Sequence, residues 1–249
     1  MGRIVAIGGG ENGRPGTNYE TESLDKEIIN LSRKKVPNFL FVGLANTCSE
    51  SYYETMRKIY VDKFGCKSDH LTENDIKDEK IHTHKIDKAD IIYVGGGNTL
   101  RLMTLLRKHK IDLLLKKAYE SGKVLCGVSA GAICWCDYGN SDSRKFTSGS
   151  DQLIKVKGLG FINVLMCPHF NKENNRQKDL PRMMKLTHKI PAIALDDGAA
   201  LEIVGNEFRI ITSIQDAKAR KCFWKNGEYI SKILEQNVYE NIEKLYKKE

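Results

Sequence analysis

Long apolar runs are missing from this 249-residue sequence. The apolar stretch in the N-terminal MGRIVAIGGG is too short for a signal-peptide core or a membrane-spanning helix, and it runs directly into glycines. We therefore expect a protein that stays in the cytoplasm, where it is made. Low-complexity linkers and internal repeats are missing as well. No domain boundary is visible, and we expect one domain over residues 1–249.

The seven cysteines lack the pairing that a disulfide framework or a zinc site requires. Their number is odd, and several lie inside apolar runs such as VLCGV and VLMCPHF. Cys134 and Cys136 are separated by one residue and have no partner pair at metal-ligand spacing. We expect reduced core thiols, no bound metal and no cofactor.

An excess of basic residues gives the chain a formal net charge of +8. Such a charge can attract nucleic acid or an acidic surface. Here the basic residues are scattered among acidic ones, and no strip of aromatic and basic residues accompanies them. We interpret the charge as a solvated surface and expect neither nucleic acid nor a membrane as a partner. The sequence leaves a homodimer open.

Apolar runs that end in glycine or other small residues alternate with helical patterns along the N-terminal half. The runs are RIVAI before Gly8, NFLFVGLAN, ADIIYV before Gly95, and KVLCGV before Ser129. Alternation of buried strands with helices predicts a mostly parallel sheet that is covered by helices on both faces. The expected fold class is α/β.

The pattern changes beyond Gly158. GFINVLMCPHF reads as a strand and residues 173–188 as a helix, and turn pairs such as Asn226-Gly227 then separate short runs of strand-forming residues. These turns predict hairpin strands added at the C-terminal end of the domain. The spacing of apolar residues from about Ser231 to Lys247 predicts a closing amphipathic helix.

The segment GVSAG at residues 127–131 fits the pattern G-x-S-x-G, between a predicted strand and a predicted helix. In this pattern a serine is held on a sharp, strained turn, and its small neighbours let a substrate carbonyl approach the hydroxyl. The helix N-terminus faces the site, and the backbone N–H of Ala130 becomes available to a developing oxyanion. We predict Ser129 as a nucleophile, with an ordinary tight turn as the alternative.

A second glycine loop, Gly95-Gly96-Gly97-Asn98, ends the preceding predicted strand. Neighbouring parallel strands end at the same edge of a sheet, where open α/β sheets bind ligands. We expect Gly97 to supply the second oxyanion donor, with Gly96 as the other candidate, and Gly96 and Asn98 to contact substrate. The alternative is an ordinary strand-to-helix turn capped by Asn98 or Thr99. The loop lacks the spacing of a phosphate-binding loop.

A serine nucleophile needs a base, and the base needs an acid that orients it. Of the six histidines, His169 follows the apolar run INVLMCP and begins a loop from which it can reach the sheet edge, although a structural histidine is the alternative. Asp142 lies in the small-residue loop GNSDS between the serine and the histidine, and we favour it as the acid. Asp137 and Asp151 remain open.

The motifs YVGGGNT, GVSAGA and PHF, in this order, resemble those of the peptidase E family of aspartyl dipeptidases, with the cyanophycinases as relatives. The resemblance covers roughly residues 3–225. It implies a fold similar to that of class I glutamine amidotransferases. It also implies a serine peptidase that cleaves short peptides, with Ser129 as nucleophile, His169 as base, and Gly97 and Ala130 as oxyanion donors.

The resemblance further implies dipeptides with an N-terminal aspartate as substrates, which requires a cation for the side-chain carboxylate. We expect Arg176 to supply it, with Arg182 as second choice and an ordinary surface arginine as the alternative. The turn Asp196-Asp197-Gly198 resembles an acidic turn of the family and is either structural or close to the pocket. Two other functions remain open: a non-catalytic binding module on a hydrolase-like fold, and a cyanophycinase-like hydrolase of isoaspartyl peptides.

Overall fold

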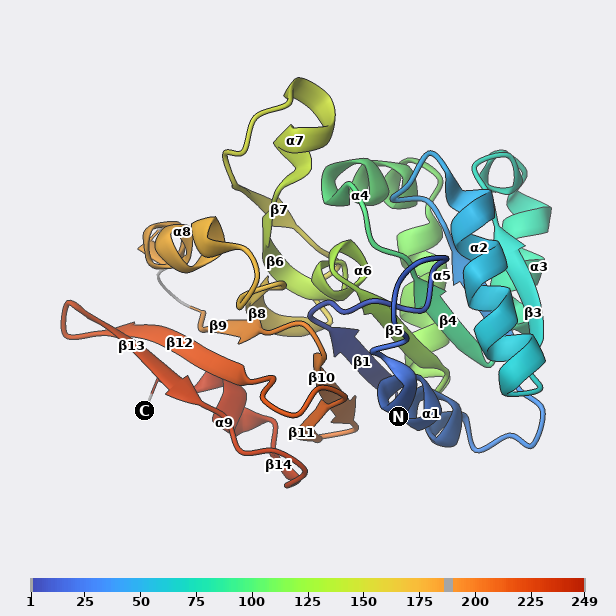
Figure 1. Ribbon diagram of the computed structural model, residues 1–249. Helices are drawn as coiled ribbons and strands as arrows, with labels where there is room; N and C mark the ends of the chain where they lie inside the picture. The colour runs from blue at the N-terminus through green and yellow to red at the C-terminus, as the bar shows by residue number, and fades with distance from the viewer. Residues whose placement is uncertain (1, 186–189, 249) are drawn as a thin grey trace.

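The computed structural model describes residues 2–185 and 190–248 (Figure 1). Its strands are β1 Arg3–Ile7, β2 Asn38–Val42, β3 Lys67–Leu71, β4 Ile91–Val94, β5 Val124–Val128, β6 Cys136–Ser141, β7 Ile154–Lys157, β8 Ile162–Cys167, β9 Ala192–Leu195, β10 Ala199–Val204, β11 Glu207–Thr212, β12 Ala219–Lys225, β13 Glu228–Ile233 and β14 Glu240–Asn241. Its helices are α1 Glu22–Ser32, α2 Ser49–Arg57, α3 Glu79–Lys88, α4 Thr99–Lys108, α5 Ile111–Glu120, α6 Ala130–Ile133, α7 Ser143–Ser148, α8 Asn174–Lys185 and α9 Glu243–Tyr246. Among these described segments, no helix has the length and apolar character needed to cross a bilayer.

The larger sheet has eight strands in the order β14-β11-β10-β1-β5-β4-β2-β3. Strands β1, β5, β4, β2 and β3 run parallel, and β10, β11 and β14 extend the sheet beyond β1 in antiparallel fashion. The central strands β1, β5, β4 and β2 are buried on both faces, because α1 and α2 cover one face and α3, α4 and α5 cover the other. The predicted α/β fold is confirmed.

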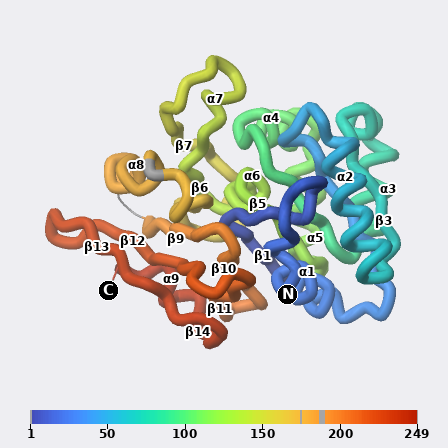
Figure 2. The backbone as a smooth tube through the Cα atoms, viewed as in Figure 1, coloured from blue at the N-terminus to red at the C-terminus, as the bar shows by residue number. Residues whose placement is uncertain are grey.

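A second sheet has six strands in the order β13-β12-β9-β8-β6-β7, and Figure 2 shows it on the side of the molecule that carries α8. One face packs against α8. The other face contributes Val164, Met166 and Ile193 to the core that also contains side chains of β1 and β5. The two sheets therefore share a core, and the connection from β9 to β10 carries the chain from the smaller sheet into the larger one.

The predicted C-terminal hairpins are confirmed, but the prediction of a closing helix from about Ser231 to Lys247 is wrong. Asn226 and Gly227 have φ values of 52° and 83°, the geometry of a tight two-residue hairpin turn, and the chain returns along β12 as β13. Helix in this region is confined to the four residues of α9. The helix expected over residues 173–188 is α8, described over Asn174–Lys185, and residues 186–188 lie outside the described part of the chain.

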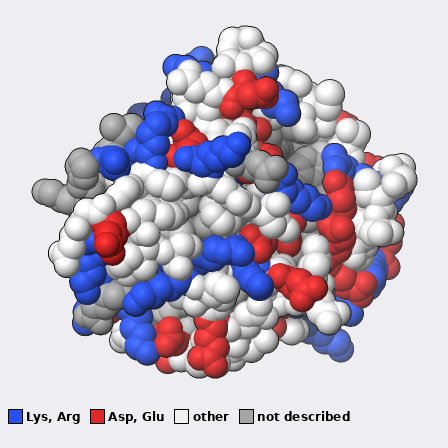
Figure 3. Space-filling model, turned by 60° about the vertical axis from the view of Figure 1, so that its left-hand side comes forward, with Lys and Arg blue, Asp and Glu red and all other residues white. Residues whose placement is uncertain are grey.

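On the face that Figure 3 shows, groups of basic side chains alternate with acidic ones. This arrangement agrees with the interpretation of the net charge of +8 as a solvated, mixed surface. The expectation that neither nucleic acid nor a membrane is a partner stays a prediction.

Candidate active site

Ser129 lies on a strained turn between β5 and α6. Its backbone has φ 55° and ψ −108°, a conformation that residues other than glycine rarely adopt. The turn needs glycine on both sides: a Cβ atom at Gly127 would lie 2.6 Å from the carbonyl oxygen of Val94, and one at Gly131 would lie 2.0 Å from it. The strained turn expected at this serine is confirmed, and it leaves the side chain partly exposed at the sheet edge.

Three consecutive carbonyl oxygens at the end of β1 hold the segments of the site together. Each accepts a backbone hydrogen bond from a different part of the chain: Ser129 N donates to Ile7 O (3.0 Å), His169 N donates to Gly8 O (3.2 Å), and Gly198 N donates to Gly9 O (2.9 Å). The serine turn, the histidine loop and the acidic turn therefore meet at one strand end, although they are far apart in the sequence.

His169 pairs with Asp197. Its Nδ1 atom lies 2.6 Å from Asp197 Oδ1, while Lys172 Nζ lies 3.0 Å from Oδ2 of the same carboxylate. Burial acts to raise the pKa of Asp197, but the hydrogen bond and charge of His169, followed by those of Lys172, outweigh it, so the pKa is lowered from its usual value. A carboxylate that stays ionised beside the Nδ1 atom leaves Nε2 as the proton acceptor of a neutral imidazole.

The structure corrects the expected acid, Asp142. Its carboxylate lies at the start of α7, where Oδ1 is 3.8 Å from Arg176 Nη2. The carboxylate that contacts His169 Nδ1 is that of Asp197. The sequence analysis expects the acid between the serine and the histidine. The carboxylate that contacts His169 instead follows it in sequence, because β10 pairs with β1 and brings the turn after β9 to the end of β1. The turn Asp196-Asp197-Gly198 has two interpretations, a structural turn or a turn close to the pocket. Its contact with His169 confirms that it lies close to the site.

The structure also corrects Arg176 as the expected substrate cation. Its side chain is 1% exposed, its Nη1 atom donates to Asn140 O at 2.5 Å, and its Nε atom donates to Glu173 Oε2 at 2.6 Å. The bond to Asn140 ties the first turn of α8 to β6. The second choice, Arg182, is an exposed residue whose partner is Asp179, next to it on α8.

Gly97 and Ala130 carry the two backbone N–H groups that are predicted to be oxyanion donors. Within residues 2–185 and 190–248, neither group donates to a protein acceptor. Gly97 has φ 137°, and a Cβ atom there would lie 2.5 Å from the carbonyl oxygen of Ala45, so only glycine fits. A Cβ atom at Gly96 would lie 3.6 Å from Ser129 Cβ, which places this loop directly beside the serine. The roles of these groups stay predictions.

Asn98 is the N-cap of α4. Its Oδ1 atom accepts a hydrogen bond from the backbone N–H of Arg101 at 3.1 Å, and the residue is 7% exposed. The predicted capping role of Asn98 is therefore confirmed, and the expectation that Asn98 contacts substrate stays a prediction.

Gly9 is a site residue that the sequence analysis missed. A Cβ atom at this position would lie 2.0 Å from Asp197 Oδ1 and 2.3 Å from His169 Nδ1, so the imidazole and carboxylate occupy the space that a side chain would need. Gly9 follows the first buried strand in the run Gly8-Gly9-Gly10, as Gly95-Gly96-Gly97 follows another. This third glycine run after a buried strand is the sequence feature that could have identified Gly9 as a site residue.

The backbones of Ser129 and His169 are anchored to adjacent carbonyl groups, those of Ile7 and Gly8. Over the described residues, Ser129 Oγ makes no hydrogen bond to His169. Catalytic hydrogen bonds of this kind are often long in the absence of a substrate and shorten when the substrate binds.

The chain is similar to known peptidases. The model of peptidase family S51 matches residues 4–211. The uncharacterized peptidase YgaJ of Bacillus subtilis (strain 168) is 32% identical over 231 residues, with 92% of this chain and 95% of that protein covered. Peptidase E of Pasteurella multocida (strain Pm70) is 28% identical over 141 residues, with 52% and 57% covered.

Solved structures share the fold. The crystal structure of a peptidase from an acI-B1 Actinobacterium has a TM-score of 0.73 at 23% identity, with 97% of each chain covered. A putative peptidase E protein from Listeria monocytogenes EGD-e has a TM-score of 0.63 at 21% identity, with 85% of this chain and 98% of that chain covered.

Proposed function

The chain belongs to peptidase family S51, and from this premise we propose that it cleaves short peptides by a serine mechanism. Ser129 is the nucleophile, His169 the base and Asp197 the acid that orients the base. The observation that carries the proposal is the 2.6 Å contact between His169 Nδ1 and Asp197 Oδ1, at the strand end that also holds the strained Ser129. A histidine held by a carboxylate beside a strained serine turn supports the roles that a catalytic triad requires.

In the first step, Ser129 Oγ attacks the carbonyl carbon of the scissile peptide bond while His169 Nε2 takes the hydroxyl proton. The imidazolium that forms is stabilised by the ionised Asp197. The negative charge that develops on the carbonyl oxygen is met by the N–H groups of Gly97 and Ala130. His169 then returns the proton to the leaving amine, the C–N bond breaks, and an acyl-enzyme ester remains on Ser129.

In the second step, water replaces the departed amine. His169 removes a proton from the water as its oxygen attacks the ester carbonyl, and the same two N–H groups stabilise the second oxyanion. The intermediate collapses, the C–O bond to Ser129 breaks, and His169 gives the proton to the serine oxygen. The products are a free carboxylic acid and the original enzyme.

For the substrate we propose short peptides with an N-terminal aspartate. The support is the resemblance of the three motifs and the 28% identity to a protein named peptidase E. Arg176 is buried and engaged, so the substrate carboxylate needs another cation. We assign this role to Lys172, whose side chain is 53% exposed and whose ammonium, although paired with Asp197 Oδ2 at 3.0 Å, lies beside the proposed site. A panel of dipeptides that vary in the first residue, with β-linked aspartyl peptides included, tests this specificity.

Reaction with a fluorophosphonate tests the serine mechanism directly, because only an activated serine reacts with this probe. We expect one label per chain in the wild type and none in Ser129→Ala, which deletes only a hydroxyl at a turn lined by small residues. His169→Ala should label far more slowly. A wild-type protein that folds normally but takes no label would instead favour the binding-module alternative.

A further inference from the structure

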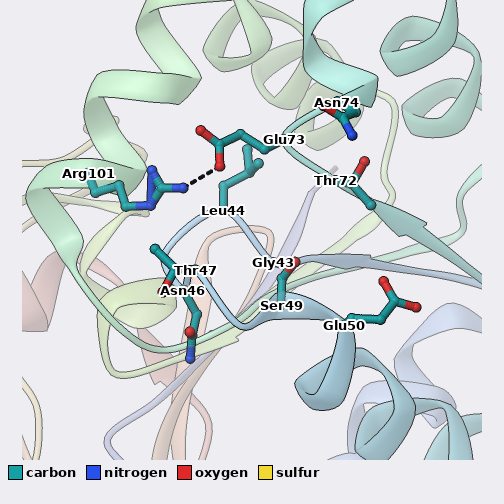
Figure 4. Close-up of a pocket in the computed structure, with 10 residues that line it drawn as sticks. All are labelled: Gly43, Leu44, Asn46, Thr47, Ser49, Glu50, Thr72, Glu73, Asn74 and Arg101. Carbon is teal, nitrogen blue, oxygen red and sulfur yellow. Dashed lines mark hydrogen bonds and ion pairs between the residues drawn. The ribbon is translucent and has the colours of Figure 1, made fainter.

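A polar pocket of about 240 Å³ opens at the C-terminal ends of β2 and β3 (Figure 4). It is separate from the serine turn, because β2 is two strands away from β5 in the sheet. The loop after β2, the first turn of α2, the loop after β3 and one side chain of α4 line it. The C-terminal edge of a parallel sheet is the usual place for a ligand in an open α/β fold.

One end of the pocket holds a guanidinium paired with a carboxylate. Arg101 reaches in from α4, and its Nη2 atom lies 2.5 Å from Glu73 Oε2. Its Nε atom is buried and has no hydrogen-bond partner among the described residues. A buried N–H group without a partner is unfavourable, and a guanidinium with unused donors is suited to a carboxylate. Glu73 is 55% exposed, so it can rotate away when a ligand carboxylate arrives.

The opposite end of the pocket is anionic. Glu50 lies there, across Ser49 and Gly43 from Arg101 (Figure 4), and its side chain is 83% exposed. Its nearest described partner is the Nδ1 atom of His70, 3.4 Å away. Burial, the largest cause, lowers the pKa of His70. The imidazole is therefore neutral near pH 7 and does not compensate the charge of Glu50.

We propose that this pocket binds a short peptide by both of its charged ends, with the peptide carboxylate on Arg101 and the peptide ammonium on Glu50. Opposite charges at opposite ends select a zwitterion whose charges are separated, which a single amino acid does not provide. The volume is below the range usual for drug-sized ligands and suits a peptide of a few small residues.

The pocket shares a wall with the proposed oxyanion loop. Ala45 lies between two pocket residues, its carbonyl oxygen accepts the backbone N–H of Asn98 at 2.9 Å, and it lies directly against Gly97. Two strand spacings of about 4.8 Å separate β5 from β2. At about 3.4 Å per residue, a peptide whose scissile bond is at Ser129 needs about three further residues to reach the pocket. A dipeptide held at Ser129 does not reach it.

The binding test uses Ser129→Ala protein, so that the probe is not cleaved and the outcome does not depend on the serine mechanism. The probes are trialanine, trialanine amide and N-acetyl-trialanine, titrated by calorimetry. We expect Arg101→Gln to weaken trialanine about tenfold or more and to leave the amide unchanged. Glu50→Gln should weaken trialanine and leave the N-acetyl peptide unchanged. Lys108→Gln, which removes an exposed charge from the same helix, should change nothing.

Equal weakening of trialanine and its amide by Arg101→Gln, or no weakening in either pocket variant, would overturn the proposal. Circular dichroism of each variant identifies a loss that comes from unfolding, and the exposed Glu50 provides a second variant that leaves the core untouched.

Discussion

Asp197 holds His169 through one carboxylate oxygen and Lys172 through the other. Replacing it by asparagine keeps the size of the side chain but offers an amide that can donate to Nδ1. The imidazole is then stabilised in the tautomer whose Nε2 atom carries the proton and is unable to accept one from Ser129. We expect Asp197→Asn to lower kcat by roughly 10³–10⁴ with little change in the unfolding temperature.

The matched control is Asp142→Asn, because Asp142 lies between Ser129 and His169 in sequence but faces Arg176. Its kcat should stay within a few-fold of the wild type. Steady-state kinetics on one dipeptide, together with fluorophosphonate labelling rates, measure both variants. A silent Asp197→Asn beside an inactive Asp142→Asn would return the acid to the GNSDS loop.

At the scale of residues, the sequence identified what local chemistry determines. Ser129 and its flanking glycines were predictable from the sequence, because a strained turn tolerates few residue types. Asp197 was not predictable as the partner of His169, because their contact depends on the antiparallel pairing of β10 with β1, which no local pattern records. Arg176 was misassigned for a related reason: its burial depends on Asn140, 36 positions earlier in the chain.

At the scale of elements, the end of β1 is the point on which the site depends. Its three carbonyl groups position the serine turn, the histidine loop and the acidic turn, and Gly9 leaves room for the imidazole and carboxylate. Gly9→Ala should therefore push His169 and Asp197 apart without forcing an unusual φ. A displacement of about 1 Å typically lowers activity about 10²-fold, and we expect a loss of kcat of that order.

Gly16→Ala is the control for this substitution. Gly16 lies in the loop that follows β1, and an added methyl group there has no atom within 4 Å. It has φ 86°, so alanine should lower the stability by about 1 kcal/mol and leave kcat unchanged. Kinetics and thermal unfolding of the two variants separate the effects. Wild-type kcat in Gly9→Ala would show that the space beside the pair is not needed.

The elements of the larger sheet were predictable because each buried strand is a short apolar run that ends in glycine, as in ADIIYVGGG. The second sheet was not, since strand order and the change from one sheet to the other depend on pairings between distant segments. The segment from Ser231 onward shows the limit of periodicity. Its apolar spacing suits a helix, but the hairpin turn at Asn226-Gly227 directs the chain back along β12.

At the scale of the whole molecule, folding buries Asp25, an acidic residue of α1, in the core. Asp25 is 1% exposed and accepts hydrogen bonds from three hydroxyl groups: Tyr60 Oη at 2.7 Å, Tyr19 Oη at 2.9 Å and Thr21 Oγ1 at 2.9 Å. Burial raises the pKa of this carboxyl to about 6, although the three hydrogen bonds act in the opposite direction. The value in the unfolded chain is about 3.9.

This difference makes the stability of the fold depend on pH. Between about pH 4 and pH 6 the unfolded chain releases the Asp25 proton while the folded chain retains it, so this residue lowers the free energy of unfolding as the pH rises. The depressed pKa of Asp197 has the opposite sign: its contribution is present above about pH 4 and is lost as the pH falls further.

Asp25→Asn isolates the first effect, because both proteins keep Asp197 and its contribution cancels in the comparison. We expect the free energy of unfolding of the variant, relative to the wild type, to rise by about 2 kcal/mol between pH 4 and pH 7. Urea denaturation at the two pH values measures it, and any constant offset from the altered hydrogen bonds drops out of the difference. The control is Asp151→Asn, an exposed acid in the loop before β7, which should track the wild type at both pH values. A constant difference between Asp25→Asn and wild type would mean that Asp25 is ionised in the folded core throughout this range, with the three hydroxyl groups offsetting its burial.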